Sequence, residues 1–309
     1  MLNIGHLSTV YHTNFILMGT NELQKNLKLD VKWHLFGTGP AMLSAFKKKQ
    51  LDIGYMGLPP AIIGIDQGVP IKCVAGGHIE GTIMIGKKEF SKISQLNYNI
   101  QKVLSQFKGK TIGVPSKGSI HDVIIRHYIE QNRLQDDIII KNYPQAEYIA
   151  LDMEKNVIEG GVGTPSLAQF ASTLFKSHII IPPEKLWPNN PSYGIFFHKN
   201  IIKDYPKIVM KFLSHHKRAS FLIRNSPLKA AEITANIIKI IDRKFVQSIL
   251  EISPKYCIAL SQEYVNSTME FMNVLFQFGY IETPLEILDI FNFEFIEKIH
   301  PEEPHYFTQ

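Results

Sequence analysis

The order of apolar and polar residues predicts strands that alternate with helices over the first two thirds of the chain. Short β-type runs at 2–7, 31–36 and 51–56 are separated by amphipathic stretches at 15–27 and 41–46. Strands that alternate with helices form mainly parallel sheets flanked by helices. We therefore predict an α/β protein.

Glycine-containing turns follow these strands and begin the next helices. Thr38 is the expected N-cap after 31–36, and Gly57 precedes another helical start. In parallel sheets, ligands bind at the carboxyl ends of strands, against the N-termini of helices. The strand at 71–75 is predicted to end in a turn at 76–81, where three glycines would allow a ligand to approach the backbone closely.

A second strand–turn–helix unit is predicted further along the chain. The strand at 111–114 leads into a turn at 116–119 and a helix at 120–131. Ser119 and Asp122 have the spacing of a capping box. The backbone N–H groups of this turn, together with Lys117, predict an anion site. No phosphate-binding loop of the G-x-x-x-x-G-K-[ST] type is present, so nucleotide hydrolysis is not indicated.

The remainder of the chain is helical from about residue 204. In the helix that Ser261 is expected to cap, four apolar residues recur at helical spacing and are predicted to face the core. They are Val265, Met269, Met272 and Phe276.

Composition narrows the possible functions. The 309 residues suggest about two domains, and 45% hydrophobic with 20% charged residues is typical of a globular protein. The net charge of +5 is spread along the chain, which argues against nucleic-acid binding, and 47–49 is read as a solvated helix end. No apolar run reaches the length of a membrane span. Cys73 and Cys257 lack zinc-site spacing and are expected to be buried free thiols, so neither a metal nor a cofactor is predicted.

An ordered series of motifs resembles a known family. It comprises Phe-Gly-Thr-Gly-Pro-Ala at 36–41, Leu-Asp-Ile-Gly-Tyr-Met-Gly at 51–57, Gly-Val-Pro-Ile-Lys at 68–72 and Val-Ala-Gly at 74–76. Over about residues 1–225 the chain resembles the solute-binding proteins of nitrate, taurine, sulfonate and thiamine-pyrimidine ABC transporters.

The resemblance implies a two-lobed type II periplasmic-binding-protein-like fold with a mixed, mainly parallel sheet flanked by helices in each lobe. Lobe 1 would comprise 1–84 plus 196–309, including the helical C-terminal region, and lobe 2 would comprise 85–195. The ligand would lie between the lobes, which would close on it. No chemistry is required of such a protein, so it is not expected to be an enzyme.

By resemblance, the protein binds a small anionic or heteroaromatic metabolite and delivers it to a permease and an ATPase. It would be a monomer that meets the membrane only through the transporter. The candidate ligand-binding residues lie in the loops after the predicted strands and in one proline-rich segment: Ser8, Thr9, Tyr11, His12, Gly37, Thr38, Gly39, Gly57, Leu58, Gly77, His78, Ser116, Lys117, Gly118, Ser119, Thr164 and Trp187.

Two alternatives stay open at this point. The fungal thiamine-pyrimidine synthase resembles the same family, but Met56 and Pro60 stand here where that enzyme has lysine and histidine. A different enzyme could use His12 or His78 as a base, and a ligand sensor could use the same fold. The first residues read as a strand and not as an export signal. The location is therefore extracytoplasmic by resemblance, with cytoplasmic as the alternative.

Overall fold

The computed structural model describes residues 1–307, and these form two compact units. Unit 1 comprises Met1–Ile79 and the described residues from 190 to 307, and unit 2 comprises Glu80–Asn189. The chain therefore passes between the units at 79/80 and 189/190. The crossings expected at 84/85 and 195/196 fall inside strands, where ladder hydrogen bonds tie each residue to one sheet.

Unit 1 is built on a five-stranded sheet in the order β2-β1-β3-β10-β4. The strands β1, β2 and β3 are parallel, whereas β10 runs antiparallel to both β3 and β4. Their bounds are β1 (Leu2–Leu7), β2 (Val31–Phe36), β3 (Ile53–Met56), β4 (Ile71–Ile79) and β10 (Pro191–His198).

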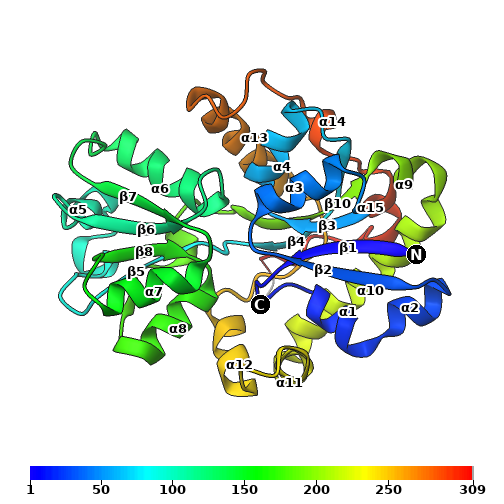
Figure 1. The fold of residues 1–309 in the computed structure, drawn as a ribbon, viewed down its shortest axis with the longest axis horizontal. Helices are drawn as coiled ribbons and strands as arrows, with labels where there is room; N and C mark the ends of the chain where they lie inside the picture. Colours follow the sequence, from blue (N-terminus) through cyan, green and yellow to red (C-terminus); the bar gives the residue numbers. More distant parts are fainter. Residues whose placement is uncertain (308–309) are drawn as a thin grey trace. The chain divides into compact units, whose positions relative to one another are not determined.

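Helices cover both faces of this sheet (Figure 1). Gly5 and Gly54 point toward α3, where a Cβ on Gly54 would come within 2.7 Å of the Phe46 ring. On the opposite face lies α10. The helices of unit 1 are α1 (Asn14–Thr20), α2 (Glu22–Leu27), α3 (Gly39–Lys47), α4 (Leu58–Asp66), α9 (Lys199–Asp204), α10 (Pro206–Asn225), α11 (Pro227–Ile238), α12 (Arg243–Ile252), α13 (Gln262–Gln277), α14 (Ile287–Ile290) and α15 (Glu294–Ile299).

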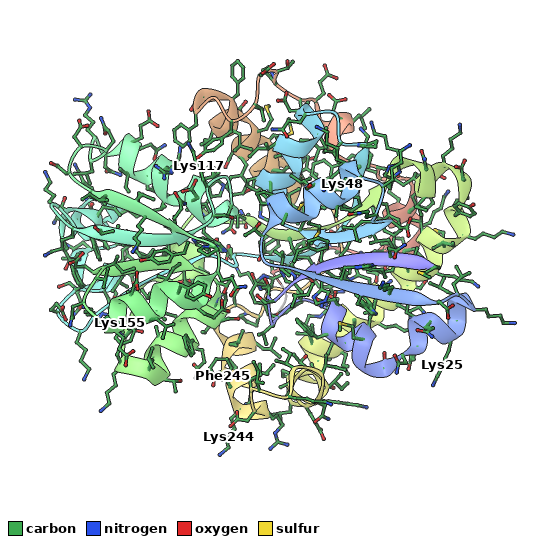
Figure 2. The ribbon with its side chains drawn as sticks, viewed as in Figure 1. Lys25, Lys48, Lys117, Lys155, Lys244 and Phe245 are labelled. Carbon is green, nitrogen blue, oxygen red and sulfur yellow. The ribbon has the colours of Figure 1, made fainter. Side chains whose placement is uncertain are left out.

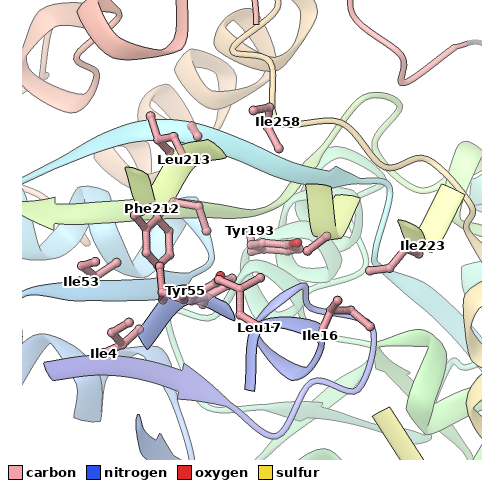
Figure 3. Packing of buried hydrophobic residues seen from close by; sticks show 14 of the residues in the cluster. Ile4, Ile16, Leu17, Ile53, Tyr55, Tyr193, Phe212, Leu213, Ile223 and Ile258 are labelled. Atoms are coloured by element: carbon pink, nitrogen blue, oxygen red, sulfur yellow. The ribbon is translucent and has the colours of Figure 1, made fainter. Parts of the chain in front are cut away.

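The core on the α10 face is densely apolar (Figure 3). Ile4 and Ile53 alternate along their strands with the glycines of the α3 face, and both are fully buried. They lie in one cluster with Phe212 and Leu213 of α10. Burial of such a side chain contributes about 1.5–3 kcal/mol, so this face contributes strongly to the stability of unit 1.

Unit 2 repeats the same sheet plan in the order β7-β6-β8-β5-β9. Its first three strands in this order are parallel, and β5 runs antiparallel to β8 and β9. The elements are β5 (Ile83–Gly86), β6 (Thr111–Pro115), β7 (Ile139–Tyr143), β8 (Gly160–Gly163), β9 (His178–Ile181), α5 (Ile100–Ser105), α6 (Ile120–Gln131), α7 (Ala146–Glu154), α8 (Pro165–Phe175) and the 3-10 turns η1 (Ile93–Leu96) and η2 (Pro183–Lys185).

Three local predictions were wrong. The helix expected over 15–27 is two helices, because Asn21 is left-handed (φ 54°) and its N–H bonds to the carbonyl of Leu17. The turn expected at 76–81 begins too early, because β4 runs through Gly76 and Gly77 to Ile79. The predicted apolar face of α13 is wrong at Phe276, which is 45% exposed, whereas Val265 and Met272 are buried as predicted.

Other local predictions are confirmed. Ser261 caps α13 as predicted, by accepting from Tyr264 N–H, and Asp242 caps α12 in the same way by accepting from Phe245 N–H. Both cysteines are buried free thiols. The three lysines at 47–49 are exposed. Figure 2 shows lysines distributed over several helices and turns, among them Lys25, Lys48, Lys155 and Lys244. Within residues 1–307, none of the helices combines the length and apolar character that crossing a bilayer requires.

Candidate ligand-binding site

The strand order of unit 1 gathers the predicted loops at one edge of its sheet. Because β1, β2 and β3 are parallel, the segments that follow them, 8–13, 37–39 and 57–58, leave the same edge. The antiparallel β10 starts at this edge, and β4 ends there, with His78 opposite Tyr193. The edge of unit 1 therefore combines five strand ends.

Two helices begin at this edge in close contact. Thr38 Oγ1 accepts from Ala41 N–H at 3.3 Å, which confirms its predicted role as N-cap of α3. A Cβ on Gly39 would lie 2.8 Å from the Pro60 ring of α4, so glycine permits the two helix starts to touch. Gly57 is the N-cap of α4 and provides no side chain, while Leu58 is fully buried.

These helix starts offer fewer donors than predicted. Pro40 occupies the first turn of α3, and Pro59 and Pro60 occupy that of α4. Proline lacks an N–H group. Binding of a ligand by backbone N–H groups at 37–39 and 57 therefore depends on few donors.

The loop after β1 divides into an exposed part and a buried part. Ser8 is exposed and Thr9 is partly buried, whereas Tyr11 and His12 are each only 3% exposed. Tyr11 Oη and Ser192 Oγ are hydrogen-bonded at 2.8 Å. The His12 ring lies 3.9 Å from the Tyr193 ring, centroid to centroid. These contacts attach the loop after β1 to the start of β10.

His78 is held inside unit 1. Its Nε2–H donates to the carbonyl of Ser253 at 2.7 Å. Burial lowers the pKa of His78 to about 4, so the ring is neutral at pH 7. Its Nδ1 is buried and has no hydrogen-bond partner among the described residues, and the same holds for Nδ1 of His12.

Gly77 serves the protein's own packing and not the predicted approach of a ligand. A Cβ at this position would lie 2.1 Å from the Tyr193 ring, and one on Gly76 would lie 2.2 Å from Tyr306 Oη. Neither glycine has a positive φ. The aromatic rings of unit 1 thus fill the space that the absent side chains leave.

Seven buried side chains near this edge form what we call the histidine–tyrosine cluster. Ring centroids of Tyr11 and His78 are 4.9 Å apart, and those of His78 and Tyr256 are 4.6 Å apart. Burial lowers the pKa of the histidines and raises that of the tyrosines, so the cluster is polar but uncharged at pH 7. Its members are Tyr11, His12, Tyr55, His78, Tyr193, His216 and Tyr256.

A hydrogen-bonded chain orders part of this cluster. Tyr193 Oη donates to Thr13 Oγ1 at 3.4 Å, and the Thr13 hydroxyl donates to His216 Nδ1 at 2.8 Å. His216 Nε2–H then donates to the carbonyl of Gly76 at 2.7 Å. The sequence analysis missed Thr13, Tyr193 and His216, because about 180 to 200 residues separate Thr13 from its partners and no spacing motif connects them.

In unit 2, the predicted anion site is largely occupied by its own side chains. Ser119 Oγ caps α6 by accepting from Asp122 N–H, as predicted. Asp122 Oδ2 accepts from Gly118 N–H at 3.0 Å, and Ser119 N–H donates to the carbonyl of Ser116. The buried carboxylate of Asp122 also pairs with Arg126 at 2.8 Å. Two N–H groups of the turn and one at the start of α6 are therefore satisfied locally, and a negative charge lies where an anion was expected.

Of the remaining predicted residues of unit 2, Thr164 and Lys117 lie at one edge of its sheet, and Trp187 lies in the segment after β9. Thr164 precedes α8 at the edge where β8 ends, which is also the edge of the turn after β6, and it makes no side-chain capping bond. Lys117 is exposed on that turn (Figure 2). Trp187 is 5% exposed; its N–H donates to Tyr128 Oη at 3.0 Å and its ring lies 4.8 Å from His127. Trp187 thus packs against unit 2 itself.

Comparison with known proteins identifies the family. Residues 1–239 match the model of the NMT1-like family, so this chain belongs to that family. A protein of Bacillus subtilis (strain 168), whose name assigns it to aliphatic sulfonate binding, is 22% identical over 270 residues, which cover 87% of this chain and 78% of the relative.

Solved structures confirm the predicted fold class. The periplasmic aliphatic sulphonate binding protein SsuA from Escherichia coli superposes with a TM-score of 0.79 at 14% identity, covering 94% of this chain and 91% of SsuA. The periplasmic nitrate-binding protein NrtA from Synechocystis PCC 6803 gives a TM-score of 0.76 at 12% identity, covering 97% of this chain and 88% of NrtA. The fold is therefore that of the two-lobed periplasmic binding proteins.

Proposed function

We propose that this protein is the solute-binding component of an ABC importer and that its ligand binds at the strand-end edge of unit 1. Membership of the NMT1-like family supports this proposal, as do the names of relatives that bind sulfonates and nitrate. Its partners would be a permease and an ATPase, and it would act outside the cytoplasm. Closure of the two lobes on the ligand stays a prediction.

The observation that carries the proposal is the convergence of five strand ends beside buried polar atoms without partners. His12 Nδ1 and His78 Nδ1 are such atoms. A buried polar group that lacks a hydrogen bond costs about 1–3 kcal/mol, and a ligand that supplies a donor would recover it. Because His78 Nε2 carries the proton in its bond to Ser253, its Nδ1 is an acceptor.

The charge of the site favours the heteroaromatic class of predicted ligands over the anionic class. Among residues 1–307, no lysine or arginine is buried. A compact inorganic anion is usually held by charge-assisted bonds or by several N–H groups, and prolines reduce the latter here. Neutral imidazoles and tyrosine rings suit a planar heteroaromatic solute that donates hydrogen bonds. We therefore favour a pyrimidine-like metabolite over a nitrate-like anion.

The alternative hypothesis is an enzyme that uses His12 or His78 as its base. A base must reach its substrate with a free lone pair and a suitable pKa. Burial holds the pKa of His78 at about 4 and that of His12 well below its usual value, which makes both weak bases. Binding without conversion is therefore the expected outcome.

The test begins with mass spectrometry of small molecules released from natively purified protein. Calorimetric titration with an aminopyrimidine, ethanesulfonate, taurine and nitrate follows. We expect saturable binding of the aminopyrimidine, with no product after prolonged incubation. His12→Gln should weaken binding about tenfold, which corresponds to one hydrogen bond. His34→Gln is the matched control, since His34 lies on β2 and contacts Asn3.

Binding of nitrate alone would overturn the proposed ligand class but not the transport function. Consumption of any candidate would overturn the binding-protein proposal itself.

A further inference from the structure

Three metal-ligating side chains that are not part of the histidine–tyrosine cluster meet in unit 1. Cys257 lies between α12 and α13, and His300 and His305 lie after α15. The cysteine is separated from the two histidines by 43 and 48 residues. Such separations explain why the spacing of cysteines and histidines in the sequence indicated no metal site. We call these three residues the Cys–His–His cluster.

We propose that Cys257, His300 and His305 bind a single Zn²⁺ ion, with Sγ, Nε2 and Nδ1 as ligand atoms. Sγ lies 3.2 Å from His300 Nε2 and 3.6 Å from His305 Nδ1, and the two nitrogens are 3.1 Å apart. In a tetrahedral zinc site with bonds of about 2.3 Å to sulfur and about 2.0–2.1 Å to nitrogen, such atoms are about 3.3–3.6 Å apart. The observed triangle needs shifts of only a few tenths of an ångström.

Hydrogen bonds alone cannot account for all three short contacts in the Cys–His–His cluster. In a neutral imidazole, each nitrogen is either a donor or an acceptor. The contact between the two histidine nitrogens uses one as donor, and that nitrogen has a single proton for both of its short contacts. At most two of the three contacts can therefore be well-aligned hydrogen bonds. One ion at the centre would satisfy all three ligand atoms together.

Two backbone N–H groups are directed at the sulfur of Cys257. Sγ of Cys257 accepts from Ala259 N–H at 3.5 Å and from His305 N–H at 3.3 Å. Bonds of this kind orient a ligand and tune it. Burial lowers the pKa of both histidines, and a neutral imidazole offers one unprotonated nitrogen that can serve as a ligand atom. Burial also raises the pKa of the Cys257 thiol, so metal binding must release a proton.

The cluster opens to a cavity of about 300 Å³ that provides the fourth position. Lys217, Arg224 and Glu302 contribute to its lining. Glu302 forms an ion pair with Lys217, and its carboxylate lies 3.8 Å from His300 Nε2. This carboxylate is the nearest charge of the sign that would balance the ion. A cysteine, two histidines and a carboxylate or water suit zinc better than calcium or magnesium.

Zinc in this position would fasten the C-terminal segment to unit 1. Lys217 Nζ donates to the carbonyl of Ile299, and Tyr306 Oη donates to that of Ala259. The ion would connect the segment after α12 to the C-terminal segment, as the bond from Tyr306 to Ala259 does, through stronger bonds. Its expected effect is therefore a rise in the thermal stability of unit 1 with zinc concentration.

The test uses the full, untagged chain, freed of metal and titrated with Co²⁺ and then with Zn²⁺. We expect one Co²⁺ per chain, a sulfur-to-cobalt charge-transfer band, tetrahedral visible bands, and displacement by one equivalent of Zn²⁺. Cys257→Ser should abolish the charge-transfer band. His305→Asn, at a partly exposed position, should weaken Zn²⁺ binding at least about 100-fold. Cys73→Ala, which changes the other buried thiol, should leave the spectrum unchanged.

Two results would overturn the proposal. One is wild-type protein that shows no stoichiometric binding at micromolar Zn²⁺. The other is binding that survives both cluster variants, which would place the metal elsewhere. Circular dichroism of each variant establishes that it is folded, so a lost signal reports on the site.

Discussion

The two units share one sheet plan but use their strand-end turns differently. In unit 2 the turn before α6 is closed by its own side chains, with Asp122 bonded to Gly118 N–H and paired with Arg126. In unit 1 the turn before α3 has only the Thr38 cap, and buried histidines with unpartnered nitrogens lie at the same edge. The same sheet plan thus supports a turn in unit 2 whose N–H groups bond to its own side chains. In unit 1 it supports a site with buried nitrogens that can still accept a hydrogen bond.

The two tryptophans allow each unit to be followed separately. Trp33 lies on β2 of unit 1, and Trp187 lies in unit 2. In the background Trp187→Phe, fluorescence reports the unfolding of unit 1, and in Trp33→Phe it reports that of unit 2. Each prediction below is measured by denaturant unfolding in these two backgrounds.

The largest expected difference is the response to acid. Burial lowers the pKa of His78 and of His216 to about 4, from about 6.5 when unfolded. A group with a lowered folded pKa stabilises fully above the unfolded value and loses that contribution as pH falls to the folded value. Unit 1 should therefore lose on the order of 3 kcal/mol per histidine between pH 7 and pH 4.

The control for this prediction is unit 2, in which His121 is the one histidine whose pKa is lowered to about 4 among its described residues. The free energy that unit 2 loses through this histidine should be at most half of that lost by unit 1, where the pKa of buried His12 is also well below its usual value. Equal acid sensitivity of the two units would contradict the contrast in buried histidines.

The second prediction concerns the closed turn of unit 2. Asp122→Ala removes a buried carboxylate that accepts from Gly118 N–H, Arg126 and Asn142. Because Arg126 is one-third exposed, water recovers part of the lost interaction. We expect unit 2 to lose about 2–3 kcal/mol of unfolding free energy, with unit 1 unchanged. Asp122→Asn should retain part of it, and a loss below 0.5 kcal/mol would show that the network is not stabilising.

The smallest prediction compares the two helix caps directly. Thr38→Ala and Ser119→Ala each remove one side-chain bond to a backbone N–H at 3.3 Å. Each should lower the unfolding free energy of its own unit by about 1 kcal/mol. Ligand titration then sharpens the comparison, since only Thr38→Ala should also weaken binding. Weakened binding in Ser119→Ala alone would instead place the ligand at the turn of unit 2.

The sequence predicted local structure correctly where interactions between residues close along the chain determine that structure. Caps such as Thr38, Ser119 and Asp242 act over three residues, so their pattern is visible without the fold. The family motifs and the alternation of strands and helices gave the fold class for the same reason. The left-handed Asn21 was missed, because its conformation divides an otherwise continuous helical pattern.

The sites depended on contacts that only the tertiary structure creates. Gly77 suggested a ligand approach, yet the ring of Tyr193, 116 positions later, fills the space beside it. Cys257, His300 and His305 have no motif, and yet their ligand atoms lie within 3.6 Å of one another. Hydrogen-bonding periodicity and capping are short-range in sequence, whereas sheet order and packing set which distant side chains meet. The sequence by itself therefore determined the fold and the family. The folded structure decided which polar groups bond to one another and which are left to bind a ligand.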